Sequence, residues 1–201
     1  MNELARQALT AVPALPAGDL QLSPSLTLSV LPPRATVLLQ VPARALARAP
    51  AVEILSTRLP HTPNTWSGED PLACWVAPDE WLMQSQRLTP QELIAATRAA
   101  LNTLPSAVTD YSHARLNFRL AGADAPSILA RGSAVNLAEE ASSLNLCVST
   151  RLAQCRVLIR VAARHRFELI VDACLSLYLH DWLLNTVEGL RGGTPVHRTR
   201  D

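Results

Sequence analysis

The fold prediction starts from residues 72–83, which read Leu72-Ala73-Cys74-Trp75-Val76-Ala77-Pro78-Asp79-Glu80-Trp81-Leu82-Met83. This stretch joins two short apolar runs through a turn. The runs, 72–76 and 81–83, have the length and composition of strands, and Ala77-Pro78-Asp79-Glu80 places Pro and Asp where turns favour them. We therefore predict a β-hairpin here. Thr89-Pro90-Gln91-Glu92 follows, with an N-cap Thr, a Pro at the first helical position and a Glu three residues after the cap, so it predicts a helix over 90–104.

Similar signals continue in both directions. Upstream we predict a strand at 36–41, a short helix at 43–49 ended by Pro50, a strand at 52–55 and a loop at 60–71. Downstream we predict strands at 113–120, 134–137, 147–152, 155–161 and 167–171, a helix from the 122–126 turn to Arg131-Gly132, and a last helix at 174–190 before Gly192-Gly193.

The order strand, helix, strand, loop, strand, strand, helix occurs twice, which indicates an internal duplication. We predict an α+β protein with one domain over 34–191, built from similar halves at about 34–104 and 105–191 that pack as one pseudo-symmetric sheet system covered by helices. Residues 1–33 are a Pro-rich N-terminal arm that resists both helix and central strand. The arm either packs on a partner or is a poorly ordered tail, and 192–201 is a flexible tail.

The composition narrows the function classes. All 18 basic residues are Arg, which excludes a Schiff-base or phosphate-loop lysine, and the net charge of +1 without a basic block argues against nucleic acid or membrane partners. The four cysteines lack the close spacing of zinc or redox sites, so reduced, buried thiols are expected. No leader pattern and no apolar run of about 20 residues occurs, so we expect a cytoplasmic protein.

Several segments resemble one family. Residues 110–115 and 120–125 resemble the strand and turn of the folate-binding domain of the glycine-cleavage T protein. Leu59-Pro60, Pro63-Asn64 and the octet 75–82 resemble sarcosine oxidase gamma subunits within that superfamily, and 167–171 with 178–184 is similar to their closing strand and helix. Ala77 stands where the family pattern has Gly, and a positive φ there would cost ~1 kcal/mol.

The resemblance implies a glycine-cleavage T protein/TrmE-like folate-binding domain fold and a non-catalytic accessory role. Such a gamma subunit packs on the alpha subunit of a heterotetrameric oxidase, and through it on beta and delta. The complex demethylates sarcosine to glycine, passes the one-carbon unit to tetrahydrofolate and produces hydrogen peroxide. FAD, FMN, NAD and zinc would be held by other subunits, with none in this chain. A stand-alone folate-binding regulator of the same superfamily is the alternative.

The candidate site residues are partner contacts, and no catalytic, cofactor or metal residue is predicted. Tryptophan is enriched at interface hot spots, so Trp75, Trp81 and Trp182 are either interface or core residues. Acidic side chains in the hairpin turn either pair with arginines of a partner or are solvated. The interface candidates are Trp75, Asp79, Glu80, Trp81, His113 and Arg115.

Two pairs of residues suggest other chemistry. A hydrolase would need Ser112 and His113 together, but neighbouring residues of a strand point to opposite faces, and the sequence around Ser112 lacks a Gly-x-Ser-x-Gly elbow. His180 and Asp181 are expected to diverge on a helix, which argues against an acid/base or metal pair. His61, His165 and His197 lie too far apart in the sequence to show metal-ligand spacing.

Overall fold

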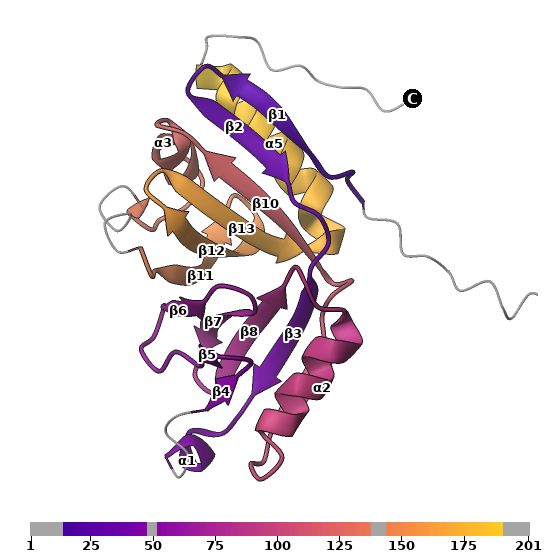
Figure 1. Cartoon of the computed structure of the whole chain (residues 1–201). Helices are drawn as coiled ribbons and strands as arrows, with labels where there is room; N and C mark the ends of the chain where they lie inside the picture. The colour runs from indigo at the N-terminus through magenta and orange to yellow at the C-terminus, as the bar shows by residue number, and fades with distance from the viewer. Residues whose placement is uncertain (1–13, 48–51, 138–143, 191–201) are drawn as a thin grey trace, which may run out of the picture.

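The computed structural model describes residues 14–47, 52–137 and 144–190, and it stacks two β-sheets with helices on their outer sides (Figure 1). The six-stranded sheet has the order β1 (Gly18–Ser23), β2 (Leu26–Val30), β10 (Arg115–Ala121), β13 (Arg166–Asp172), β12 (Cys155–Ala163), β11 (Cys147–Leu152). The five-stranded sheet has the order β6 (Trp66–Gly68), β7 (Leu72–Ala77), β8 (Glu80–Ser85), β3 (Ala35–Gln40), β9 (Ala107–Asp110). A small ribbon pairs β4 (Glu53–Ile54) with β5 (Thr57–Arg58).

The helices cover the outer sides of the sheets. They are α1 (Ala43–Leu46), α2 (Pro90–Ala100), α3 (Ala125–Ala130), the 3₁₀ turn η2 (Ala173–Leu175) and α5 (Ser176–Leu190). The helices α3 and α5 pack on the six-stranded sheet, where Leu179, Leu183 and Val187 of α5 are buried at helical spacing. On the five-stranded sheet, α2 buries Leu93 against β3. The arrangement is therefore helix, sheet, sheet, helix.

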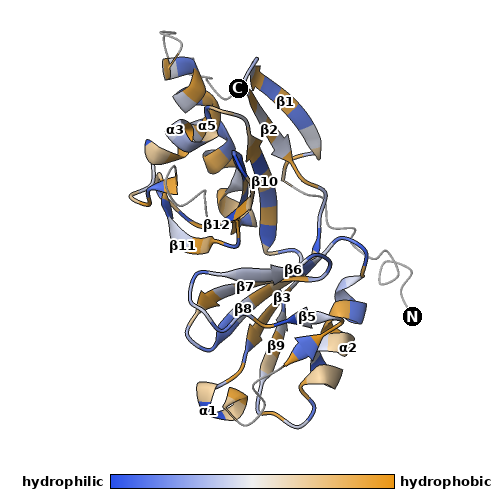
Figure 2. Cartoon of the chain, turned by 60° about the vertical axis from the view of Figure 1, so that its left-hand side comes forward, coloured by the Kyte–Doolittle hydropathy of each residue, from blue (hydrophilic) through white to orange (hydrophobic). Residues whose placement is uncertain are grey.

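Alternating side chains along each central strand separate the outer core from the space between the sheets. Along β10, Leu116, Phe118 and Leu120 belong to the helix-side core, and Figure 2 shows the alternation of hydrophobic and hydrophilic residues along this strand. A smaller apolar cluster lies on the opposite, inter-sheet side. It is formed by Leu72, Cys74 and Leu82 from one sheet and by Cys147, Leu158 and Ile170 from the other. Polar residues share that inter-sheet side, and they form the site described below.

The hairpin and the capped helix are confirmed. The hairpin β7–β8 pairs Trp75 with Trp81, and the positive φ of its turn falls on Asp79 (66°) rather than on Ala77, which removes the strain expected there. At the start of α2, Thr89 and Glu92 exchange hydrogen bonds as a capping box. The strands predicted at 36–41, 52–55, 113–120, 147–152, 155–161 and 167–171 are present with small shifts at their ends.

Two predictions are wrong. Residues 18–30 are not part of an arm that resists strands, because they form the hairpin β1–β2, and β2 is an interior strand beside β10. The prolines do not prevent this, since Pro24 lies in the turn between the two strands and Pro32-Pro33 follow β2. Residues 134–137 form no strand. The arm residues 1–13, the end of the first helix at 48–50 and the tail 192–201 lie outside the described residues.

Both sheets follow the same order of strands. In one, the neighbours run β3, β8, β7, β6, and in the other they run β10, β13, β12, β11, so the first strand pairs with the last in each case. Beyond this shared unit, β9 lies beside β3 and β2 lies beside β10. The strand that precedes each unit in the chain therefore belongs to the sheet of the other unit, which ties the two sheets together. No helix among the described residues has the length and apolarity to span a bilayer.

Candidate functional site

The most concentrated chemistry between the sheets is a buried carboxylate with three guanidinium partners. Glu168 on β13 is 2% exposed, and its oxygens accept hydrogen bonds from Arg34 (2.9 Å), Arg119 (3.0 Å) and Arg160 (2.7 Å). Register explains the cluster, because Glu168 lies directly opposite Arg119 on one neighbouring strand and Arg160 on the other. Arg34 reaches it from the connection between β2 and β3.

The electrostatics of this cluster hold Glu168 ionised. Burial alone raises the pKa of Glu168, but the hydrogen bond from Arg34 and the positive charges of Arg160 and Arg34 outweigh it and lower the pKa to about 2. A carboxylate with this pKa neither takes up nor gives a proton near neutral pH. The cluster therefore holds the connection between β2 and β3 against the six-stranded sheet through a carboxylate that stays ionised near neutral pH.

A neutral polar network continues beside the cluster. The side-chain amide of Gln84 donates to Thr36 Oγ1 (3.2 Å) and to Asn117 Oδ1 (3.0 Å), which links strands from both sheets. Ser112 Oγ accepts a hydrogen bond from the Thr36 backbone N–H (3.0 Å), and the Asp110 carboxylate accepts one from the Ser112 N–H (2.8 Å). The Ser112 hydroxyl is thus committed to the backbone of β3.

The tip of the β7–β8 hairpin borders an apolar hollow of about 490 Å³. Trp75 is half-buried at its edge and Asp79 is exposed there. Trp81 is only 2% exposed, and its indole N–H donates to the Pro60 carbonyl (2.7 Å). Trp81 is therefore a core residue, which corrects its prediction as a direct partner contact. Leu46 and Pro78 also line this hollow, together with Ala43, Ala47, His61 and Pro63.

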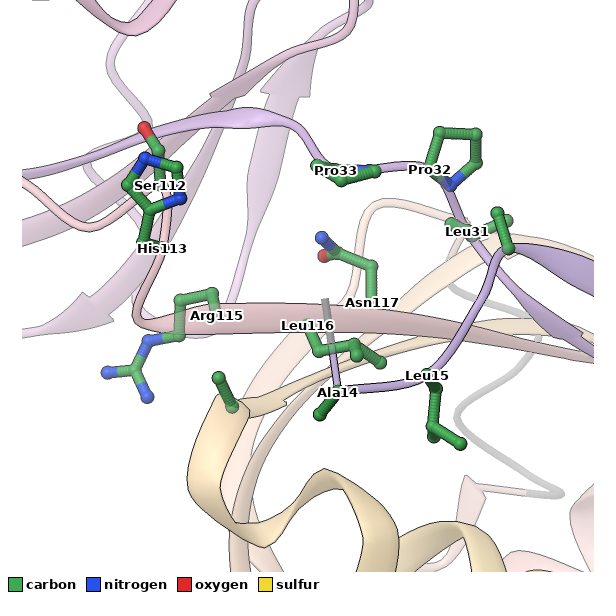
Figure 3. Close-up of a pocket in the computed structure, with 12 residues that line it drawn as sticks. Ala14, Leu15, Leu31, Pro32, Pro33, Ser112, His113, Arg115, Leu116 and Asn117 are labelled. Carbon is green, nitrogen blue, oxygen red and sulfur yellow. The ribbon is translucent and has the colours of Figure 1, made fainter. Parts of the chain in front are cut away.

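A second hollow, of about 270 Å³, lies where the chain passes between the two sheets (Figure 3). Leu31, Pro32 and Pro33 form one wall, and Ala14 and Leu15 from the start of the described chain lie on the other side. His113 and Ser112 lie together at one end of the hollow. In Figure 3 the guanidinium of Arg115 points away from this hollow.

Arg115 also lines a third hollow, a cleft of about 340 Å³ between the two sheets, and this cleft includes Glu80 on the opposite sheet. Arg115 forms an ion pair with Asp172, and its guanidinium lies 5.2 Å from the centre of the Tyr111 ring. Glu80 accepts a hydrogen bond from the side-chain amide of Gln40 (2.7 Å).

The predicted interface residues therefore form separate groups. Trp75 and Asp79 share the hollow at the hairpin tip, whereas Glu80 and Arg115 face each other across the inter-sheet cleft. His113 lies in the second hollow with Arg115. Glu168 and its arginines were not predicted from the sequence, although a single Glu within the apolar run 167–171 is an unusual feature that could have indicated a buried ion pair.

The pairs that suggested catalysis are positioned as follows. Ser112 is buried and His113 is exposed, both in the turn before β10 rather than within a strand. The prediction that His180 and Asp181 diverge is wrong, since His180 Nδ1 lies 3.5 Å from Asp181 Oδ1, although the Asp181 side chain is 66% exposed. Neighbouring residues of a helix can meet when one side chain bends back along the surface, and such an exposed pair contributes little energy.

Most of the cysteine thiols are buried, and the described residues hold no cluster of metal ligands. Cys74, Cys147 and Cys155 are buried, as expected, but Cys174 is exposed. A hydrogen bond with Cys147 and burial raise the pKa of the Cys74 thiol well above its ordinary value, which keeps it protonated. Within 14–47, 52–137 and 144–190, no three His, Cys, Asp or Glu side chains converge as metal ligands would.

Comparison with known proteins gives one consistent result. The family model described as "Sarcosine oxidase, gamma subunit family" matches residues 42–188. The curated "Sarcosine oxidase subunit gamma" of Corynebacterium sp. (strain P-1) is 29% identical over 143 residues, which is 69% of this chain and 68% of the relative.

Two solved structures share the fold. A chain of the heterotetrameric sarcosine oxidase from Corynebacterium sp. U-96, in complex with pyrrole 2-carboxylate, superposes with a TM-score of 0.74 at 20% identity, covering 82% of this chain and 84% of that one. The glycine cleavage system aminomethyltransferase T from Bartonella henselae superposes with a TM-score of 0.54 at 12% identity, covering 77% of this chain and 44% of that one. These likenesses support the α+β fold related to the glycine-cleavage T protein that the sequence predicts.

Proposed function

Because the chain belongs to the sarcosine oxidase gamma subunit family, we propose that it is the non-catalytic accessory subunit of a heterotetrameric sarcosine oxidase. The family match over 42–188 carries this proposal, and it spans both sheets. The curated gamma subunit and the oxidase chain with the same fold support it. The polar groups between the sheets support it further, because Glu168 and Ser112 are engaged in structural contacts at the connections that run between the sheets.

The complex would oxidatively demethylate sarcosine to glycine, transfer the one-carbon unit to tetrahydrofolate and release hydrogen peroxide. In this proposal the chain packs on the alpha subunit, and through it on beta and delta. Other subunits hold FAD, FMN, NAD and zinc, and the assembly works in the cytoplasm. The Corynebacterium chain of similar fold comes from a heterotetramer, which supports an assembly of this kind.

The surfaces that meet the partner are those already singled out. Trp75 and Asp79 present an aromatic and an acidic group at the hairpin tip, and such a combination suits an apolar anchor with a nearby cation. His113 lies exposed beside the hollow at the chain crossing. Glu80 and Arg115 belong to the inter-sheet cleft. These contacts are proposals about the assembly, and they can be tested one surface at a time.

We also propose that the two sheets descend from an internal duplication within one domain. The shared order of strands supports this, since β3, β8, β7, β6 and β10, β13, β12, β11 are connected alike. The exchange of β2 and β9 between the sheets explains why the halves would form a single domain, because each sheet is completed by a strand that precedes the other unit.

Co-expression tests the accessory role. The tagged chain is produced with the candidate alpha, beta and delta subunits of its own organism, captured, and assayed for flavin absorbance and for sarcosine-dependent hydrogen peroxide. We expect the large flavin-bearing subunits to co-purify with activity. A lone, colourless chain would contradict the proposal. Titration of that lone chain with tetrahydrofolate would then test the folate-binding regulator, which stays a prediction.

A further inference from the structure

A second row of charged residues crosses the six-stranded sheet on its inter-sheet side, four residues along each strand from the buried cluster. Arg115 on β10 lies directly opposite Asp172 on β13. On β12, Arg156 directly precedes Val157, which pairs with Val171 next to Asp172. The row therefore reads Arg, acid, Arg, which is the same order as Arg119, Glu168 and Arg160 in the buried row.

The two rows differ in how completely their charges are paired. The carboxylate of Glu168 is enclosed and contacts all of its arginines, whereas the Asp172 side chain is 40% exposed and pairs with Arg115. Arg156 is exposed, and no carboxylate of the described residues lies within ion-pair distance of its guanidinium. Arg151, directly opposite Arg156 on β11, adds a further positive charge. The open row thus carries more positive than negative charge.

This open row forms one wall of the inter-sheet cleft. The floor of the cleft is apolar and consists of Leu38, Leu82, Leu158 and Ile170. Its rim carries Arg115 and Arg156 on the six-stranded sheet, and Gln40 and Glu80 on the other. Because Glu80 is hydrogen-bonded to Gln40, it faces the arginines from the far wall without pairing with them in this structure.

The two arginines of the rim repel each other. Burial lowers the pKa of Arg115, and the positive charge of Arg156 lowers it further, although the Tyr111 side chain acts in the opposite direction. Asp172 already pairs with Arg115, so Arg156 is the guanidinium that an added carboxylate would meet, and Arg presents paired N–H donors that match a carboxylate. An apolar floor beneath such donors favours a group that combines an acid with a hydrocarbon chain.

We propose that this cleft is a docking point for a partner subunit, which places an acidic side chain on the guanidinium of Arg156 and a neighbouring apolar side chain on the floor of Leu82, Leu158 and Ile170. The inference rests on the proposed accessory function and names the chemistry of one contact within it. Charge complementarity carries it, because Arg156 is a cation at the mouth of a concave, partly apolar site and lacks an ion-pair partner among the described residues.

Charge reversal at Arg156 tests this docking point. The matched control is Arg164→Glu, because Arg164 is exposed at the turn of the same β12–β13 hairpin, eight residues and roughly 26 Å along the strand from Arg156. Tagged wild type, Arg156→Glu, Arg156→Gln and Arg164→Glu are each co-expressed with the other subunits, and the dissociation rate of the captured complex is measured at low and high salt. Unfolding curves of all four proteins confirm that they fold.

We expect dissociation to accelerate about tenfold for Arg156→Glu, less for Arg156→Gln, and under about twofold for Arg164→Glu, with a weaker salt dependence once the Arg156 charge is removed. If the wild type binds the subunits and Arg156→Glu and Arg156→Gln dissociate at the wild-type rate, the docking point is wrong while the accessory function stands. If the wild type captures no subunit, the accessory function fails and this inference fails with it.

Discussion

Replacing Glu168 by Gln tests how much the buried cluster stabilises the fold. The substitution keeps the shape of the side chain but removes the only carboxylate that contacts Arg34, Arg119 and Arg160 within the described residues. The pKa of Glu168 falls from 4.5 to about 2 in the folded protein. A tenfold change in proton affinity is worth about 1.4 kcal/mol, so the ionised form gains about 3 kcal/mol from the fold.

Removing one member of a buried ion pair typically costs about 3–5 kcal/mol, because the remaining charges stay buried without compensation. We therefore expect Glu168→Gln to lower the free energy of unfolding by about 3–5 kcal/mol at pH 7, measured by urea unfolding and tryptophan fluorescence. Trp66 is a useful reporter, since the Arg160 guanidinium lies 4.4 Å from its ring centre. The control Glu69→Gln alters an exposed residue and should change stability by less than about 0.5 kcal/mol.

The pH dependence gives an independent check. Because the folded-state pKa of Glu168 is depressed, its contribution is fully present above pH 4.5 and is lost as the pH falls toward about 2. The stability difference between wild type and Glu168→Gln should therefore shrink across that window. A cost below about 1 kcal/mol at pH 7, or a difference that does not change between pH 4.5 and 2, would show that the ionised Glu168 does not stabilise the fold.

Two further predictions concern the packing of the sheets and the thiols. Gly122 has a φ of 136°, and a Cβ there would overlap the carbonyl oxygen of Ser25, so Gly122→Ala should lower the unfolding free energy by about 2 kcal/mol or more. Urea unfolding measures this against the control Gly189→Ala, where a Cβ meets no atom, and equal stability of the two variants would contradict the close contact. In the native protein a maleimide should modify Cys174 first, and mass mapping that finds Cys74 or Cys147 modified before unfolding would contradict their burial.

Local sequence signals predicted the elements whose partners lie nearby. The hairpin β7–β8 and the capping box of Thr89 and Glu92 each depend on a few consecutive residues. Both can therefore be predicted from the local sequence without the rest of the chain. The β1–β2 hairpin was missed because its segment is rich in proline, yet Pro24 and Pro32 lie in connections outside the strands. Its place in the sheet depends on β10, nearly a hundred residues away, and on Gly122 accepting the Ser25 turn at close range.

The chemistry between the sheets was harder to predict than the elements. Arg34, Arg119, Arg160 and Glu168 belong to distant segments, and only the strand register brings them together. The pattern of a sequence indicates alternation along a strand, but not which strands become neighbours. Arg115 was identified through a family resemblance, whereas its counterpart Arg156 carries no sequence signal and appears only when β12 is placed beside β13.

The most direct test of the accessory role is a native mass spectrum of the assembly captured through this chain after co-expression with the alpha, beta and delta candidates. We expect a heterotetramer that contains one copy of this chain, carries flavin and oxidises sarcosine. A spectrum that contains only the chain itself, while the other subunits assemble into an active, flavin-bearing oxidase without it, would show that the chain is not an accessory subunit of this oxidase.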